Sequence, residues 1–168
     1  SLQQRFGVDT AQARRVAQTA LTLFKQLMPD SDPAFQRKLE WAAALHEIGC
    51  QISHSDYHVH GAYILDNTDI AGFSVPELHR LGMLVLGQKG RVRKLDTDLE
   101  DAVFAQQLLC LRLAVALCHA RREPDLEGID LAFQGSQFAL QTRSGWSKAY
   151  PQSAHLLEDE VVAWQKTP

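Results

Sequence analysis

The chain lacks any apolar run near the length of about 18 residues that a membrane-spanning helix needs. It also lacks the basic and then apolar opening of a secretory signal. Its three cysteines, Cys50, Cys110 and Cys118, are an odd number without the spacing of a disulfide framework. On one helix, Cys110 and Cys118 would lie about 12 Å apart, too far for a disulfide. These absences predict a cytoplasmic protein with reduced thiols and no membrane partner.

Sequence signatures of several catalytic sites are missing as well. The chain contains no P-loop, no Cys-x-x-Cys metal pair and no serine, histidine and aspartate in the order of a known triad. Gly87 and Gly90 form a close pair in a basic setting, but no predicted strand precedes them as a phosphate loop requires. No repeat, low-complexity tract or long linker divides the 168 residues, of which 45% are apolar and 22% charged. We therefore expect a single globular domain with one core.

Helical spacing of apolar residues runs through most of the chain. We expect helices over residues 9–28, 33–49, 58–67, 74–87 and 97–122, and a closing helix from Pro151. Capping boxes predict the starts of three of these helices, at Asp9, Ser74 and Thr97. Gly49 is expected to end the second helix in a left-handed cap.

The helix expected over residues 97–122 is the longest of the set. It is apolar nearly all round from Leu108 to Cys118, which predicts a central helix covered on most sides. Its Arg112 then needs an acidic partner, either Glu47 or another acid. The helix ends with Arg121 and Arg122, cations that suit the negative end of its dipole.

Near the end of the chain the helical spacing gives way to alternation. Residues 129–133 and 138–140 alternate, and Gly135-Ser136 between them suits a two-residue turn. The sequence therefore predicts a mainly α fold. A helical core over residues 1–122 is followed, over residues 123–168, by a β-hairpin and a terminal helix.

Residues 46–65 hold four of the seven histidines of the chain, with two carboxylates among them. The members of this group are His46, His54, His58 and His60 with Glu47 and Asp56. Imidazoles and carboxylates at this density indicate a metal site or a phosphate site.

The net charge of −3 conceals a basic stretch. Residues 78–95 contain five lysines and arginines and no acidic residue. Such a patch attracts polyanions, although a solvated basic surface without a ligand is the competing interpretation.

Several phrases of the sequence resemble the ordered landmarks of the HD metal-dependent phosphohydrolase fold. They are residues 12–17, His46-Glu-Ile-Gly49, Gly61-Ala-Tyr-Ile-Leu65 and Leu111-Arg-Leu-Ala-Val115. The whole chain resembles more closely the C-terminal region of the exopolyphosphatase/guanosine pentaphosphate phosphohydrolase family. The phrases Leu45-His-Glu-Ile-Gly49 and His58 to Phe73 carry this likeness, and the central helix, hairpin and final helix follow in order.

The resemblance also shows where the chain departs from a working HD site. Members with activity are expected to bind metal through a histidine in the first helix, a His-Asp doublet and an aspartate in the late helix. These positions read Gln12, His46-Glu47 and Val115 in this chain. Too few ligands remain for a catalytic metal, so we expect none in this domain. The weak remaining candidates are His46, Glu47, His54 and His58, and a buried imidazole bonded to the backbone or to Glu47 is the favoured role of His46.

The resemblance implies that catalysis belongs to N-terminal actin-like domains of a longer enzyme, aided by Mg²⁺, and that this part was excised from it. The chain would then be an accessory domain for polyphosphate or guanosine pentaphosphate, with a possible homodimer and no nucleic acid partner. The cations expected to bind the polyanion are Lys89, Arg91, Arg93, Lys94, Arg80, Arg121 and Arg122. Two alternatives stay open: a self-sufficient HD phosphohydrolase, and a module that serves dimerisation or interaction alone.

Overall fold

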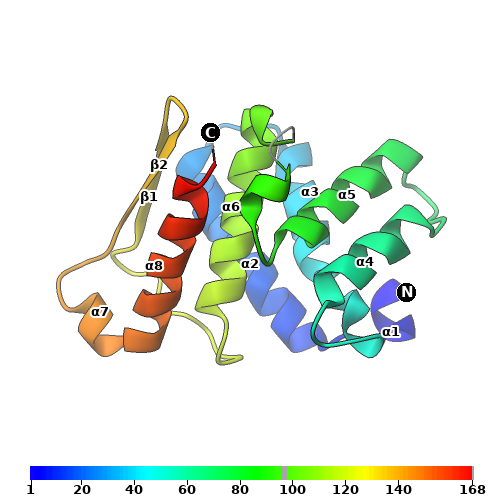
Figure 1. Ribbon diagram of the computed structural model, residues 1–168, viewed down its shortest axis with the longest axis horizontal. Helices are drawn as coiled ribbons and strands as arrows, with labels where there is room; N and C mark the ends of the chain where they lie inside the picture. Colours follow the sequence, from blue (N-terminus) through cyan, green and yellow to red (C-terminus); the bar gives the residue numbers. More distant parts are fainter. Residues whose placement is uncertain (96–97, 168) are drawn as a thin grey trace.

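The computed structural model describes residues 1–95 and 98–167, except for the side chain of Arg93. Its helices are α1 (Leu2–Arg5), α2 (Thr10–Leu27), α3 (Pro33–Ala44), α4 (Tyr57–Asp66), α5 (Val75–Gly87), α6 (Ala102–Leu117), α7 (Trp146–Ala149) and α8 (Pro151–Gln165). Short 3₁₀ turns lie at Ile48–Gln51, Val92–Leu95 and Asp98–Glu100, and the strands are β1 (Asp130–Gln134) and β2 (Gln137–Gln141). The predicted fold class, mainly α with a hairpin and a closing helix, is confirmed (Figure 1).

Helices α2 and α6 lie side by side in the middle of the molecule (Figure 1). Twelve of the sixteen residues of α6 are buried, among them Leu108, Leu111 and Ala114, as its apolar sequence predicted. Helices α3, α4 and α5 lie on one side of this pair, whereas the hairpin and α8 lie on the other. The two sides therefore present separate surfaces that share one core.

Several of the main helices begin at a residue whose side chain accepts a hydrogen bond from a free backbone N–H group of the first turn. The predicted capping box of α5 is complete, because Ser74 and Glu77 each accept from the other's backbone N–H. Asp9 caps α2 through the N–H of Gln12, but the side chain of Gln12 turns into the core and does not complete a box. Helix α6 begins after Asp101, whose carboxylate accepts from two backbone N–H groups. The predicted start at Thr97 lies outside the described residues, and α6, with 16 residues, is shorter than the 18-residue α2.

The prediction that the second helix reaches Gly49 and ends there in a left-handed cap is wrong. Helix α3 ends at Ala44, and Gly49 lies within a 3₁₀ turn. A Cβ atom on Gly49 would come 2.1 Å from the carbonyl oxygen of Tyr57 and 2.7 Å from the nitrogen of Gly61. The glycine is therefore required for close approach, and it lets the 3₁₀ turn pack directly against α4.

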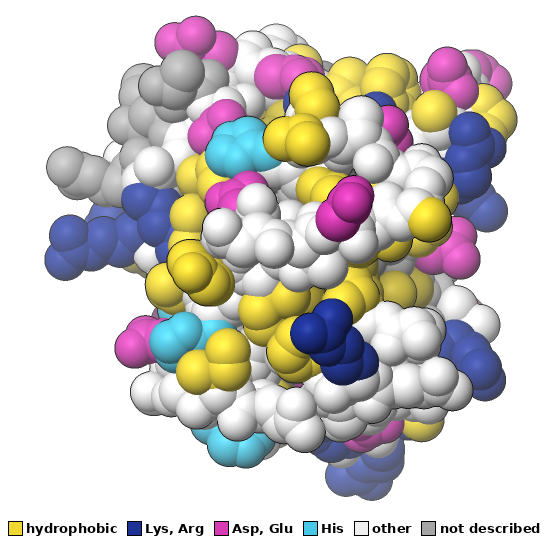
Figure 2. All heavy atoms as spheres, turned by 90° about the vertical axis from the view of Figure 1, so that its right-hand side faces the viewer, with side chains coloured by type: hydrophobic (Ala, Val, Ile, Leu, Met, Phe, Trp, Pro, Cys, Tyr) yellow, Lys and Arg dark blue, Asp and Glu magenta, His cyan; other side chains and the backbone are white. Residues whose placement is uncertain are grey.

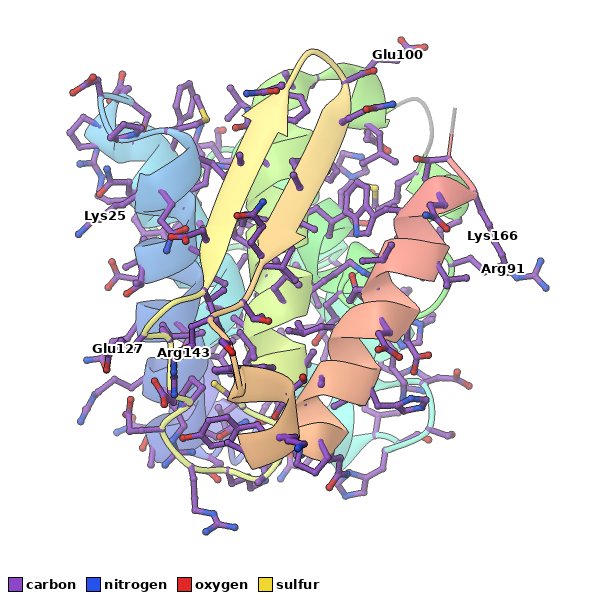
Figure 3. The ribbon with its side chains drawn as sticks, turned by 90° about the vertical axis from the view of Figure 1, so that its left-hand side faces the viewer. Lys25, Arg91, Glu100, Glu127, Arg143 and Lys166 are labelled. Atoms are coloured by element: carbon purple, nitrogen blue, oxygen red, sulfur yellow. The ribbon has the colours of Figure 1, made fainter. Side chains whose placement is uncertain are left out.

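The hairpin has the predicted turn, with Gly135 at φ 63° in the first central position of the two-residue loop. Leu131 is paired with Leu140 and Phe133 with Phe138, so the apolar side chains share one face. This face packs toward α6 and α8 (Figure 3).

Cys50, Cys110 and Cys118 are free thiols. Burial raises the pKa of the Cys110 thiol far above its usual range, so this cysteine behaves as a small apolar core residue. No helix in the part of the chain that the structure describes is long and apolar enough to cross a membrane.

Candidate functional site

His46, the histidine of the expected doublet, is a core residue with 2% of its surface exposed. Its Nδ1 lies 2.6 Å from the carbonyl oxygen of Ala43, and its own carbonyl accepts from Nε2 of Gln88 at 2.8 Å. Burial lowers the pKa of His46, which keeps the imidazole neutral. Of the two partners that the sequence allowed, the backbone and Glu47, the structure shows the backbone.

The other two positions of the expected metal set also belong to the core. Gln12 donates from Nε2 to the carbonyl oxygen of Cys118 at 2.9 Å, and its Oε1 accepts from Arg15. Val115 is a partly buried apolar residue packed against the core cluster. These contacts join the start of α2 to the end of α6, which is a structural role.

Glu47 is held by an arginine. Nη2 of Arg121 lies 2.8 Å from one carboxylate oxygen of Glu47, and Nη1 lies 3.0 Å from Asp9. Arg121 has a φ of 55°, a conformation that is uncommon outside glycine. The guanidinium thus supplies positive charge between the carboxylates of Asp9 and Glu47.

No group of three or more histidine, cysteine, aspartate or glutamate residues suited to a metal ion occurs among residues 1–95 and 98–167. The carboxylate of Glu47 is engaged with Arg121, and Nδ1 of His46 faces the carbonyl of Ala43. The exposed loop residue His54 lies outside α4, whereas His58 is on its first turn. The predicted weak candidates are therefore not assembled into a ligand set.

Arg112, the charge inside the central helix, pairs with Glu160 of α8 and not with Glu47. Nη2 of Arg112 lies 2.8 Å from Oε1 of Glu160, and its Nε lies 3.0 Å from Oε2. Nη1 donates to the carbonyl of Gly87 at 2.7 Å. One guanidinium therefore connects α6 with α5 and α8.

The basic loop after α5 folds against the start of α4. Nζ of Lys89 lies 5.1 Å from the centroid of the Tyr57 ring and 3.4 Å from the carbonyl oxygen of Ser55. Lys94 donates to the carbonyl of Lys89 at 2.9 Å, which closes the loop upon itself. Two of the predicted cations and the histidine-bearing helix are thereby brought together.

His58 is a histidine on which the charges of both lysines act. It is 9% exposed, and its Nδ1 has no hydrogen-bond partner among the described residues. Burial lowers the pKa of His58, and the Lys94 and Lys89 ammonium groups lower it further. We call Lys89, Lys94 and His58 the lysine–histidine cluster.

Of the other predicted cations, Arg80 and Arg121 are paired elsewhere, and the side chain of Arg93 lies outside the part of the chain that the structure describes. Arg80 is paired with Asp101 at 3.1 Å and lies over the ring of Phe104, and Arg121 is paired as described. Arg91 projects away from the molecule near the end of α8 (Figure 3), and Arg122 is exposed. On the face in Figure 2, the lysines and arginines stand at several separate places, some of them beside acidic side chains.

Two features of the site carried no clear signal in the sequence. Tyr57 forms its wall: burial, and next the Glu47 carboxylate, raise the pKa of this phenol to about 12. Its position between Asp56 and His58, within the histidine-rich stretch, was the one feature of the sequence that could have indicated it. Asp9, the second partner of Arg121, is separated from it by 112 residues, and no local pattern joins the two.

The fold and this site define a helical domain with a hairpin, a cationic cluster and no assembled metal ligands among the described residues. The family model of the Ppx/GppA phosphatases, domain III, matches residues 1–161. The chain therefore belongs to this family.

Its relatives include guanosine-5'-triphosphate,3'-diphosphate pyrophosphatases. The protein of Aeromonas hydrophila is 32% identical over 173 residues, covering 99% of this chain and 35% of the relative. The protein of Pseudoalteromonas translucida is 34% identical over 163 residues, covering 93% and 33%, and that of Pseudoalteromonas atlantica 32% over 172 residues, covering 97% and 33%. The chain spans about a third of the length of these curated relatives.

Proposed function

We propose that this chain is an accessory domain of a phosphatase acting on phosphoanhydrides and that it binds the polyanionic substrate without a complete catalytic site of its own. Family membership and the share of the relatives that it covers support the first part. The substrate is a guanosine pentaphosphate or a polyphosphate, as the names of the relatives and the resemblance of the sequence suggest. Catalysis and Mg²⁺ then belong to the actin-like remainder of the enzyme, and a homodimer in the cytoplasm is part of the proposal.

The observation that carries the binding role is the lysine–histidine cluster. Lys89 and Lys94 have no acidic partner among the described residues, whereas Arg80, Arg112 and Arg121 are each paired with a carboxylate. Unpaired ammonium groups beside a buried imidazole donor attract phosphate oxygens and release counterions when these bind. The paired arginines serve the fold.

Titration with long-chain polyphosphate tests the proposal. Affinity is measured by calorimetry from about 50 to about 200 mM salt, and the slope of log Kd against log salt reports the phosphate contacts. The double variant Lys89→Gln/Lys94→Gln should bind more weakly and lower the magnitude of this slope by about 1.4, which is about 0.7 for each lysine lost. The control Lys25→Gln/Lys148→Gln removes the same charge from α2 and α7 and should leave the slope unchanged.

Three results would contradict the proposal in different ways. Equal losses in both double variants would mean that binding follows net charge and has no site. No salt-sensitive binding at all would leave a module for dimerisation or interaction. Stoichiometric metal in the purified chain, with hydrolysis of a phosphate ester, would show a self-sufficient HD phosphohydrolase.

A further inference from the structure

The outward side of α4 is apolar in its middle and acidic at both ends. Val59 and Tyr63 lie one turn apart on this helix, with 45% and 67% of their surfaces exposed. Asp56 and Asp66, both exposed, lie three residues beyond either end of this pair and thus on the same side of the helix. Ile52, which directly follows the 3₁₀ turn before α4, is 56% exposed, and we call Ile52, Val59 and Tyr63 the α4 face. Single exposed apolar residues are ordinary, so the position of these three decides what they mean.

The chain enters the fold beside this face. Gln3 of α1 donates from Nε2 to the carbonyl oxygen of Ala44, at the end of α3, at 2.9 Å. Gly7 lies against Gln51, since a Cβ atom on Gly7 would come 3.4 Å from Nε2 of that glutamine. Gln51 is followed directly by Ile52, and the 3₁₀ turn that it ends packs on α4. The N-terminus and α4 accordingly lie on the same side of the molecule (Figure 1), so a segment before the chain would join it near the α4 face.

The lysine–histidine cluster belongs to the same helix. His58 is on the first turn of α4, next in sequence to Val59, and Lys89 lies over the ring of Tyr57 on that turn. Figure 2 shows this side of the molecule, where apolar side chains lie exposed among basic, acidic and histidine side chains. Substrate held by the cluster can be hydrolysed only where the catalytic part of the enzyme reaches it. The catalytic part must therefore come close to α4.

The opposite side of the molecule lacks these connections. It carries a groove of about 880 Å³ between the hairpin, α6 and α8 (Figure 3). The described lining of the groove comes entirely from residues 99–167, so neither the first residues of the chain nor the cluster takes part in it. The rings of Phe138 and Trp164 meet there with centroids 5.3 Å apart, which closes part of the opening. The α4 face is thus the surface that both the entry of the chain and the cluster favour for docking.

We propose that the α4 face docks on the catalytic part of a longer enzyme and brings the lysine–histidine cluster next to that part. The inference rests on the proposed function, in which the catalytic part precedes this domain. The chain covers about a third of the length of its relatives, so a partner of about twice its size belongs to the same enzyme. Interfaces between domains of one chain bury about 600 to 1,500 Å² and are more polar than obligate interfaces, so a small apolar centre with a polar surround suits one.

The side chains of α4 define the surface that they meet. Val59 and Tyr63 require an apolar patch, and an aromatic ring with a hydroxyl group is a common anchor at such a contact. Asp56 and Asp66 at the two ends require basic or neutral groups, because like charges across an interface repel. The docking surface of the catalytic part is therefore apolar at its centre with a basic rim.

The test compares hydrogen exchange in the full-length enzyme that contains this chain with exchange in the 168-residue chain. The backbone amides of residues 57–66 should exchange about tenfold more slowly in the full-length enzyme, whereas those of α8 should exchange alike in both. Val59→Gln/Tyr63→Gln removes the apolar centre without adding charge beside the cluster, and it should return α4 of the full-length enzyme to the rate of the chain. The matched control Val161→Gln/Val162→Gln changes two exposed valines of α8 and should leave the slow exchange of α4 in place.

Equal exchange of α4 in the two proteins would overturn the proposal. So would slow exchange confined to the hairpin and α8, or slow exchange of α4 that persists in Val59→Gln/Tyr63→Gln. Slow exchange of α4 that depends on protein concentration would assign the α4 face to a second copy of the chain and overturn the proposed occupant.

Titration of the full-length enzyme and of its Lys89→Gln/Lys94→Gln variant with polyphosphate separates this inference from the proposed function. Salt-sensitive binding that weakens in the variant, with equal exchange of α4 in the two proteins, would remove the docking surface and leave the polyanion role. Slow exchange of α4 without salt-sensitive binding would support docking and contradict the polyanion role.

Discussion

At His58, burial and the neighbouring positive charges change the pKa of the imidazole in the same direction. Burial, Lys94 and Lys89 all lower its pKa, while Asp56 opposes them and His60 adds to them. In the free domain the imidazole is therefore less protonated than an ordinary histidine, with a pKa near 6.5, at the same pH. A phosphate bound between the lysines would neutralise their field and favour the charged imidazole.

Binding of polyphosphate should thus take up a proton at His58. As the pH falls from about 7.5 to about 5.5, affinity should rise by up to about tenfold for each unit by which the pKa of His58 increases on binding. His58→Gln should show a smaller rise over the same range. Both proteins share the titration of the polyphosphate ends, so the difference between their calorimetric pH profiles measures this histidine. Identical profiles would place His58 outside the site.

At the scale of single residues, the sequence was informative about which positions are unsuited to a metal and much less about the contacts that these residues form. Gln12 and Val115 could be read directly as residues unsuited to a metal, because residue type alone decides that question. The role of Arg121 could not, since its partners Asp9 and Glu47 are distant in sequence and meet only in the folded chain. The prediction for Gly49 is wrong for a related reason: the local pattern of a helix cap resembles that of a glycine needed for close packing against α4.

Among the elements, α8 is held to the core by the ion pair of Arg112 and Glu160. The sequence predicted that Arg112 needs an acidic partner but did not identify that partner. Arg112 was recognised as a buried cation needing an acid, but its partner Glu160 lies 48 residues away on the closing helix. Helix starts were easier to predict, because a cap such as Ser74 with Glu77 is a local pattern with a local bond. Elements were therefore predictable, and their contacts much less so.

Removing one partner of this ion pair should destabilise the whole domain. Side-chain exposure is 6% for Arg112 and 14% for Glu160, so Glu160→Gln leaves a buried charge without a counter-charge. The free energy of unfolding in urea should fall by about 3 kcal/mol. The double variant Arg112→Leu/Glu160→Leu should recover much of this loss, because an apolar pair of similar volume needs no desolvation of charge.

The control for this pair is Asp159→Asn, on the same helix with 64% of its side chain exposed, which should change stability by less than about 0.5 kcal/mol. If Glu160→Gln proved as mild as the control, the ion pair would contribute little and the apolar contacts of Leu157 would hold α8 in place. If the double leucine variant were worse than the single one, the pair would be necessary for the geometry of α8.

At the scale of the molecule, two surfaces lie on opposite sides of the central pair of α2 and α6. The motifs of the sequence follow one another along the chain and do not show this separation. The 3₁₀ turn, α4 and the basic loop form the side of the lysine–histidine cluster, while the hairpin and α8 form the side of the groove (Figure 1). The hairpin itself was predictable from alternation and its turn. The groove was not, since it depends on the angle at which α8 closes the fold.

The arrangement of donors around His46 predicts that this chain alone hydrolyses neither polyphosphate nor guanosine pentaphosphate, even with added Mg²⁺ or Mn²⁺. The reason is that a metal at the doublet would have to displace Arg121 from Glu47 and turn the buried imidazole away from Ala43. Phosphate release measured by a colorimetric assay should equal that of buffer with metal. Any release must be compared between His46→Ala, Glu47→Gln and the exposed control His155→Ala. Loss in the first two with retention in the third would establish catalysis at the doublet, whereas equal release in all three would indicate a contaminating phosphatase.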